Sequence, residues 1–310
     1  MSTALRPLTL ETLGALRLRG ADVVPFLQGQ LSNDIALLAP GRSLLAGYHN
    51  AQGRVIALLR LVEVAPAEVL AIMPRELSTV VASRLAKYIL RSKVTIVDDS
   101  AAWSFSGLVE DADPPGAAAR FAEELPRALD GAARLDGSIA VCVGAEPARW
   151  LLVSPPGAGS APTAPAAEDA WRRLSVAAGE PQVFAATSEE FVGQMLNLDL
   201  VGAIAFDKGC YTGQEVIARA HYRGRIKRRL QRFVTLAPAR LNPGDTGELP
   251  DGRAFKVVSA APHADGRCEF LAVAPLSGGD LEAHSAAREA AGKARTIEAR
   301  PLPLPYALPE

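Results

Sequence analysis

Apolar and polar positions in the first hundred residues alternate between the periods of strands and helices. Asp22 is a candidate N-cap for a short helix that contains Phe26, Leu27 and Leu31. Apolar residues at helical spacing over 77–89 predict a second helix with one apolar stripe. The predicted strands cover residues 13–18, 46–49, 55–64, 69–73 and 93–97, with a tight turn at 50–53. Strands interleaved with two helices indicate an α+β layer of the split βαβ kind.

The middle of the chain holds two segments rich in Pro, Gly, Ala and Ser and then a second α+β pattern. The two segments, 111–119 and 154–167, are too poor in large apolar residues to order strongly, so we expect loop excursions there. The second α+β layer begins near Trp171. In it, the capping-box spacing of Thr187 and Glu190 predicts a helix. The apolar face of this helix would consist of Phe191, Met195 and Leu198.

Beyond residue 230 the chain consists of short apolar runs between Pro- and Gly-rich turns, followed by a Pro-rich tail at 300–310. This sequence pattern is typical of a small β-barrel or β-sandwich. We therefore expect an α+β region over residues 1–230, made of two intertwined subdomains. A small β-barrel domain with an extended tail would occupy residues 231–310.

Composition and charge change this picture little. The chain has 310 residues, of which 49% are apolar and 22% charged, as in an ordinary soluble globular protein. No apolar run approaches the ~20 residues of a membrane helix. Glu11, Arg17 and Arg19 stand where a signal peptide would need a continuous apolar segment, so we expect a cytoplasmic location and no membrane contact.

Three cysteines are too few and too widely spaced for a disulfide framework. The chain has no C-x-x-C pair, and His49 and His221 are lone histidines, so we expect no stably bound metal or cluster. Cys142 and Cys268 lie in apolar, strand-like segments, which favours a structural role for both.

The third cysteine, Cys210, lies in the segment KGCYTGQE at 208–215. Neighbouring cations and turn N–H groups favour a thiolate, and Lys208 is two residues away. Gly209 and Gly213 permit backbone angles that would expose the side chain. The alternative is a buried structural cysteine, the commoner fate of a free thiol. The residues alone favour neither interpretation.

A basic run follows this segment and holds seven of the 33 Lys and Arg residues between positions 219 and 232. In an extended strand one face of this run would be wholly cationic, which predicts contact with a phosphate, a polycarboxylate or a nucleic-acid backbone. The alternative is a solvated edge strand whose charges prevent aggregation. Gln194 and Asn197, just upstream, would face either a cavity or water. The predicted anion-binding residues are Arg219, Arg223, Arg225, Gln194 and Asn197.

Several segments together resemble the folate-binding YgfZ proteins, over most of residues 10–235. The long block around Cys210 is the most specific of them. Its signature residues are Lys208, Gly209, Cys210, Tyr211, Gly213, Gln214 and Glu215. The other matching segments are 26–34, 84–97, 171–181, 191–198, 202–204, 218–219 and 222–224.

The resemblance implies the fold of the related glycine-cleavage T-protein. This is an α+β ring of three domains around a central channel that receives tetrahydrofolate, with two split βαβ-type layers and a C-terminal small β-barrel. It also implies work on iron–sulfur clusters in other enzymes, including radical enzymes that thiomethylate tRNA. Cys210 would be the catalytic thiol or a transient ligand.

The chain departs from the T-protein where folate chemistry takes place. Ala57 and Leu58 replace a pair of aspartates, and Ala177 replaces a glutamate that grips the pterin. Because the carboxylate that would handle the folate amine is missing, the sequence argues against aminomethyl transfer. Within the YgfZ pattern, Gly193 stands where proline is usual and Asp207 where lysine is usual.

The leading hypothesis is a cytoplasmic, folate-binding accessory protein for the assembly or repair of iron–sulfur clusters. Its cofactor would be tetrahydrofolate and its partners iron–sulfur client enzymes. One alternative is a tetrahydrofolate-dependent aminomethyl transferase, which Ala57 and Leu58 disfavour. The other alternative is a tRNA-binding module that uses the basic run.

Overall fold

The computed structural model describes residues 8–110, 124–156, 165–276 and 296–309. The chain divides into two compact units, each built from separate segments. Unit 1 comprises Met1–His49, Ile56–Trp171 and Gly202–Thr212, and unit 2 comprises Asn50–Val55, Arg172–Val201 and Gly213–Glu310. Both units are therefore discontinuous in sequence.

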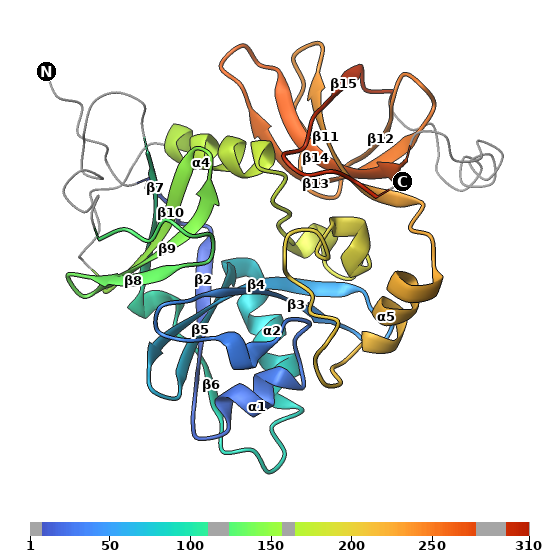
Figure 1. Ribbon diagram of the computed structural model, residues 1–310. Coiled ribbons are helices and arrows are strands. Elements are labelled where there is room, and N and C mark those ends of the chain that lie inside the picture. The colour runs from blue at the N-terminus through green and yellow to red at the C-terminus, as the bar shows by residue number, and fades with distance from the viewer. Residues whose placement is uncertain (1–7, 111–123, 157–164, 277–295, 310) are drawn as a thin grey trace, which may run out of the picture. The chain divides into compact units, whose positions relative to one another are not determined.

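The first sheet of unit 1 has the strand order β3-β4-β5-β2-β6. Strand β2 lies between β5 and β6 and pairs antiparallel with both. One helix follows β2 and another follows β5, so this sheet has the predicted split βαβ arrangement (Figure 1). The elements are β2 (Leu13–Arg19), α1 (Val23–Gln28), β3 (Leu44–His49), β4 (Val55–Ala65), β5 (Glu68–Pro74), α2 (Ser78–Ala86) and β6 (Thr95–Asp98). The five strands and two helices predicted in this region are all confirmed, with small shifts at their ends.

A second antiparallel sheet completes unit 1, in the order β1-β7-β10-β9-β8. Its inner face shares one apolar core with the first sheet, in which Leu70 and Ile72 contribute from β5 and Phe105 and Val153 from the second sheet. The strands are β1 (Leu8–Thr9), β7 (Ser104–Val109), β8 (Ala132–Leu135), β9 (Ser138–Ala145) and β10 (Ala148–Ser154). The helix α4 (Pro165–Ala177) begins in unit 1, and its residues from Arg172 on belong to unit 2. Three 3₁₀ turns also belong to unit 1: η1 (Ile35–Leu37), η2 (Arg75–Leu77) and η3 (Ser100–Ala102).

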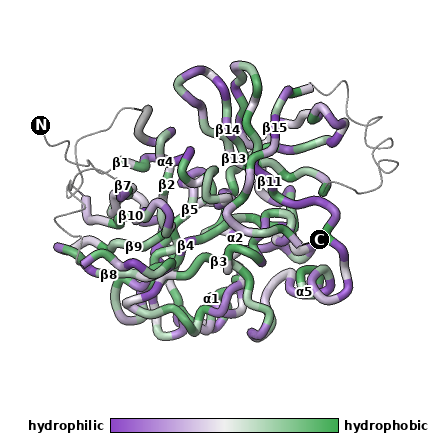
Figure 2. The backbone as a smooth tube through the Cα atoms, turned by 45° about the horizontal axis from the view of Figure 1, so that its top comes forward, coloured by the Kyte–Doolittle hydropathy of each residue, from purple (hydrophilic) through white to green (hydrophobic). Residues whose placement is uncertain are grey.

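Unit 2 contains a third five-stranded sheet, in the order β12-β13-β14-β11-β15. The rings of Phe233 and Phe270 stack at 5.5 Å in its core, and Phe255 packs on the second of them. The strands are β11 (Arg228–Thr235), β12 (Thr246–Glu248), β13 (Ala254–Pro262), β14 (Cys268–Pro275) and β15 (Ala299–Leu302). The predicted C-terminal β structure is confirmed, and Figure 2 shows that its strands are largely hydrophobic.

The helix predicted from the spacing of Thr187 and Glu190 is wrong. The segment instead forms two short 3₁₀ turns, η4 (Ala185–Thr187) and η5 (Gly193–Leu196). Thr187 closes the first turn, because its Oγ1 accepts from the main-chain N–H of Phe184 at 3.0 Å. Asn197 has a φ of +57°, a left-handed conformation that ends the second turn.

The prediction that the basic run is one extended strand is also wrong. Its first part belongs to helix α5 (Gln214–Arg223), and β11 begins only at Arg228. Gly213 starts the helix with a φ of +83°. A Cβ at Gly224 would lie 3.0 Å from the Ala220 main chain, so glycine is needed where the chain leaves the helix.

Of the two predicted loop excursions, 111–119 lies outside the described residues. In the second, 154–167, residues 157–164 also lie outside the described residues, and the structure shows only that β10 ends at Ser154 and α4 begins at Pro165. Among the described residues, no helix is long and apolar enough to cross a membrane.

Arg229 at the start of β11 forms the best-buried ion pair of unit 2. Its Nη1 and Nη2 donate to the two carboxylate oxygens of Asp199 at 3.0 and 2.9 Å, and Nη1 also reaches the Gln194 carbonyl at 3.1 Å. The two side chains are 5% and 10% exposed. Removing one partner of such a pair leaves a buried charge uncompensated.

We therefore predict that Arg229→Met lowers the free energy of unfolding by about 3 kcal/mol. Urea unfolding followed by circular dichroism measures the change. The matched control is Arg267→Met, which breaks an exposed ion pair with Asp265 and should shift the unfolding midpoint little. Equal losses in the two variants would contradict the role given to the buried pair.

Candidate functional site

The ammonium group of Lys208 organises the segment that carries Cys210. Its Nζ donates to the main-chain oxygens of Gln28 at 2.8 Å, Leu31 at 2.7 Å and Asn33 at 2.8 Å. Gln28 is the last residue of α1, so the cation lies where the helix presents unpaired carbonyls. All three protons of the ammonium are therefore used to hold the fold.

Burial lowers the pKa of Lys208 to about 8, and the carboxylate of Asp34 opposes this shift. The three carbonyl acceptors also favour the charged form. Lys208 is thus a cation at neutral pH, as the sequence suggested, but its donors point to the main chain of residues 28–33.

Two polar side chains strengthen the same connection. The Ser32 hydroxyl donates to the Ala203 carbonyl at 2.7 Å and accepts from the Gly47 N–H at 2.9 Å. The amide of Asn33 donates to the Gly202 carbonyl at 2.8 Å. The beginning and the end of the 202–212 segment are thereby both fixed to the turn after α1.

Cys210 is exposed on this fixed segment, whereas Cys142 and Cys268 are buried. Burial raises the pKa of both buried thiols, and each packs in an apolar core cluster. A Cβ at Gly209 would meet no described atom within 4 Å, so the space next to Cys210 is open. Tyr211, on the other side, is buried and anchors the segment.

Tyr211 lies between Lys208 and His49. Lys208 Nζ is 5.1 Å from the centre of its ring, and the His49 ring centre is 6.2 Å away on a tilted plane. Burial raises the pKa of Tyr211 to about 12, so the phenol stays protonated. A cation, a phenol and an imidazole are therefore grouped at the residue that follows Cys210 in the chain.

His49 is buried, and neither ring nitrogen makes a hydrogen bond to the described residues. Burial lowers its pKa to about 4, and a contact with the Gly47 main chain offsets part of this shift without reaching hydrogen-bond geometry. The imidazole is therefore neutral in the fold at physiological pH.

The rest of the signature block belongs to unit 2. Gly213 has a φ of +83°, and a Cβ there would lie 2.5 Å from the Asn50 carbonyl, so only glycine fits. Gln214 and Glu215 form the first turn of α5, where the helix dipole favours an acidic side chain. These residues shape the backbone.

The predicted anion-binding residues fall into two groups. Gln194 and Asn197 are buried, and their amides donate to the carbonyls of Ile217 at 2.7 Å and Leu230 at 3.0 Å. The Oε1 of Gln194 is buried without a partner among the described residues. The remaining predicted residues, Arg219, Arg223 and Arg225, are exposed.

The positions that carry folate chemistry in the T-protein hold no polar group here. Ala57 and Leu58 lie inside β4 with exposures of 0% and 3%. Ala177 is the last residue of α4. None of the three can bind or transfer a proton.

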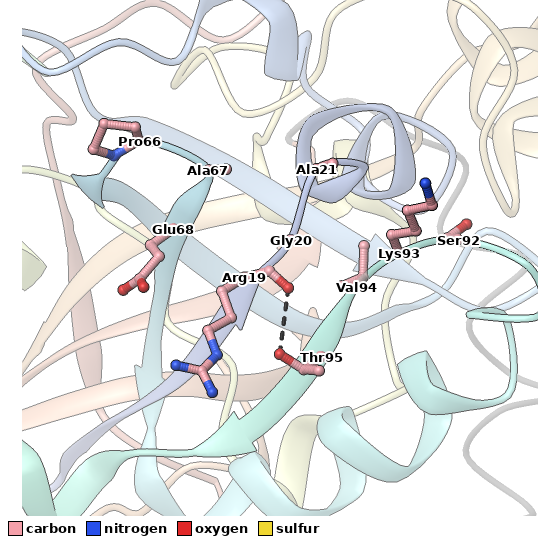
Figure 3. Close-up of a pocket in the computed structure, with 10 residues that line it drawn as sticks. All are labelled: Arg19, Gly20, Ala21, Pro66, Ala67, Glu68, Ser92, Lys93, Val94 and Thr95. Atoms are coloured by element: carbon pink, nitrogen blue, oxygen red, sulfur yellow. Dashed lines mark hydrogen bonds between the residues drawn. The ribbon is translucent and has the colours of Figure 1, made fainter.

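An open hollow of about 700 Å³ lies in unit 1 between β2, β6 and the β4–β5 turn. Figure 3 shows that Arg19 and Lys93 line it but direct their charged ends away from each other. Because its cations do not converge, this hollow offers no built anion site. Within the described ranges, no group of three or more His, Cys, Asp or Glu side chains is placed to hold a metal ion.

Sequence reasoning missed the roles of Ser32 and His49. Ser32 lies in a segment that matched the family, but one sequence gives no sign that its hydroxyl joins residues 47 and 203. His49 was recorded only as a lone histidine without ligand spacing. Asp34 caps the turn that follows it, since its side chain accepts from the Ala36 N–H at 3.2 Å.

No family model matches the chain. The tRNA-modifying protein YgfZ of Klebsiella pneumoniae is 33% identical over 325 residues, covering 99% of this chain and 95% of that protein. The chain belongs to the YgfZ family. A second YgfZ, from Escherichia coli, is 31% identical over 324 residues, covering 100% of this chain and 96% of that protein.

Among solved structures, the YgfZ-family chain is similar to the glycine cleavage system aminomethyltransferase T from Bartonella henselae. The TM-score is 0.66 at 15% identity, with 86% of this chain and 77% of the other covered. The predicted α+β, T-protein-like fold is thereby confirmed. At this level of identity the likeness shows the fold alone.

We predict that Lys208→Met lowers the free energy of unfolding by about 2–3 kcal/mol, because three carbonyls lose a charged donor. Urea unfolding measures the loss. Lys208→Arg keeps the charge, but its planar guanidinium cannot direct donors from one nitrogen to three carbonyls, so it should not restore stability. Full stability of Lys208→Arg would show that charge alone matters.

His49 predicts a pH dependence of stability. Below its ordinary pKa of 6.5 the unfolded chain takes up a proton at His49, whereas the folded protein takes it up only near pH 4. Acidification from pH 7 to 4 should therefore cost about 3 kcal/mol of stability through this residue. The variant His49→Phe should lack this part of the loss when the free energy of unfolding is measured between pH 7 and 4. An unchanged pH slope would contradict the assignment.

Proposed function

We propose that the protein supports tRNA modification through the exposed thiol of Cys210, acting on the iron–sulfur clusters of other enzymes. The observation that carries the proposal is the contrast between Cys210 and its surroundings. The thiol is exposed next to open space, while the residues on either side are fixed by Lys208 and Tyr211. The curated relatives bear the name of tRNA-modifying proteins.

A fixed, exposed thiol suits a ligand that is donated for a short time. The other two cysteines are buried, so within the described residues Cys210 is the only exposed sulfur. One thiolate cannot hold an iron–sulfur cluster, which needs several ligands. The remaining ligands would come from the client enzyme. Cys210 would bind the cluster of that enzyme for a short time during assembly or repair.

Tetrahydrofolate fits this chain only in part. Its carboxylate tail suits the exposed guanidinium groups of Arg219, Arg223 and Arg225. Gln194 and Asn197 use their amide donors on main-chain carbonyls, so they leave few groups for the pterin. We therefore derive no chemical step from folate and keep it as an expected ligand.

The aminomethyl-transferase alternative is disfavoured by the apolar side chains of Ala57 and Leu58, buried in β4. Sustained product formation from tetrahydrofolate and an aminomethyl donor would nevertheless establish it. The expected cytoplasmic location stays part of the proposal.

The test is complementation of a deletion strain with Cys210→Ser and Cys210→Ala. We predict that both variants lose most of the thiomethylated tRNA that the wild-type gene restores, while their thermal unfolding stays unchanged because the side chain is exposed. Full restoration by Cys210→Ala would overturn the proposal.

Thiol titration provides the control on the purified protein. The folded wild type should expose one reactive thiol and Cys210→Ser none, because the other two cysteines are buried. Cys142→Ala is the matched cysteine variant and should restore tRNA thiomethylation wherever it folds.

A further inference from the structure

Four cations gather on the outer surface of α5 and the segment that joins it to β11. We call them the α5 cationic surface: Arg219, Arg223, Arg225 and Lys227. All four side chains are exposed, and none makes an ion pair or side-chain hydrogen bond with the described residues. Figure 2 shows the segment after α5 as strongly hydrophilic. The chain as a whole carries a formal net charge of −1, so this concentration of charge is local.

The neighbouring cations of the same run behave differently. Arg229 is paired with Asp199 at 2.9 Å, and Arg232 is paired with Glu269 at 2.6 Å. Arg228 donates to the Ala254 carbonyl at 3.2 Å. Among the described residues, the fold thus supplies partners for the cations in β11 and none for the four cations before it.

Helix stability does not explain the α5 cationic surface. A cation in the last turn of a helix interacts well with the helix dipole, which accounts for Arg223. Arg219 lies in the middle of the helix, and Arg225 and Lys227 lie beyond its end. Arg219 follows Glu215 at i,i+4 spacing, which gives its charge a small helix-stabilising role. Arg225 and Lys227 have no such role, because they lie outside the helix.

An exposed aromatic residue lies among these cations. Tyr222 is 67% exposed and, at helical spacing, shares one face of α5 with Arg219 and Arg223. Its ring centre lies 4.7 Å from that of the neighbouring His221, in an edge-to-face arrangement. The opposite face of the helix is buried through Ile217.

We propose that the α5 cationic surface binds the sugar–phosphate backbone of RNA, with Tyr222 stacking on an unpaired base. Cations spaced along a helix and an extended segment match a chain of repeated phosphates. An exposed ring between them matches the flat bases of single-stranded loops. An acidic protein surface or a polycarboxylate would use the charges but leave the ring without a partner. The inference goes beyond the thiol site and does not depend on Cys210.

The experiment measures binding of a fluorescently labelled, unmodified tRNA transcript by anisotropy at several salt concentrations. Four phosphate contacts predict a slope of log K against log salt of about −3, or roughly 50-fold weaker binding at 200 mM than at 50 mM salt. The variant Arg219→Gln, Arg223→Gln, Arg225→Gln, Lys227→Gln should bind at least tenfold more weakly at 50 mM salt, with a slope near zero.

A matched variant removes four exposed cations from unit 1: Arg19→Gln, Lys87→Gln, Arg91→Gln and Lys93→Gln. It should keep wild-type affinity within about threefold and keep the wild-type slope. Equal loss in the two quadruple variants would overturn the proposal, because any surface cation would then serve.

Three further measurements separate the contributions. Tyr222→Ala should weaken binding about tenfold without changing the salt slope, because stacking releases no counterions. Cys210→Ser should bind the transcript like the wild type, so failure of the thiol proposal and failure of this one are distinguishable. Two results together would assign the surface to an acidic partner instead. Polyglutamate at an equal concentration of charge would displace the RNA, and Tyr222→Ala would bind the RNA with wild-type affinity.

Discussion

The hydrogen bonds from one ammonium group to three carbonyls determine how the Cys210 segment is presented. Lys208 satisfies the main-chain oxygens of Gln28, Leu31 and Asn33, which lie at the end of α1 and in the turn that follows. These carbonyls have no partner in the helix itself, so a cation is the natural donor at this place. Because Lys208 is two residues from Cys210, fixing the lysine also fixes the cysteine. The exposed thiol is thus displayed on one of the best-anchored segments of unit 1.

This arrangement changes the meaning of the signature block. From the sequence, Lys208 was expected to act on the thiol through its charge. In the structure its protons point to the main chain, Tyr211 fills the space below, and Gly213 meets a backbone requirement. Lys208, Tyr211 and Gly213 are therefore architecture around the exposed thiol. That division explains how a long and specific motif can surround only one reactive side chain.

The sequence predicted the sheets well because their apolar runs are local signals with a period of two. It failed where geometry depends on a single residue, as at Asn197, whose left-handed conformation ends the turn that was expected to be a helix. The three carbonyls that Lys208 contacts lie 175 to 180 positions away in the chain, and no local pattern can reveal such a contact. Cys210 itself could be singled out, but its exposure could not. His49 was visible only as an isolated residue because its burial comes from tertiary packing.

The basic run shows how folding assigns different roles to the same residue type. A buried arginine needs a carboxylate partner, because an unpaired buried charge is costly. Arg229 is buried and forms an ion pair with Asp199. An arginine that stays in water has no such need, and Arg219 and Arg225 have none of these partners among the described residues. The sequence shows one cationic run. In the structure the cations before β11 are exposed, whereas those from Arg228 on, where β11 begins, have partners. Charge that the fold itself does not neutralise is the part of the run that remains available to an outside anion.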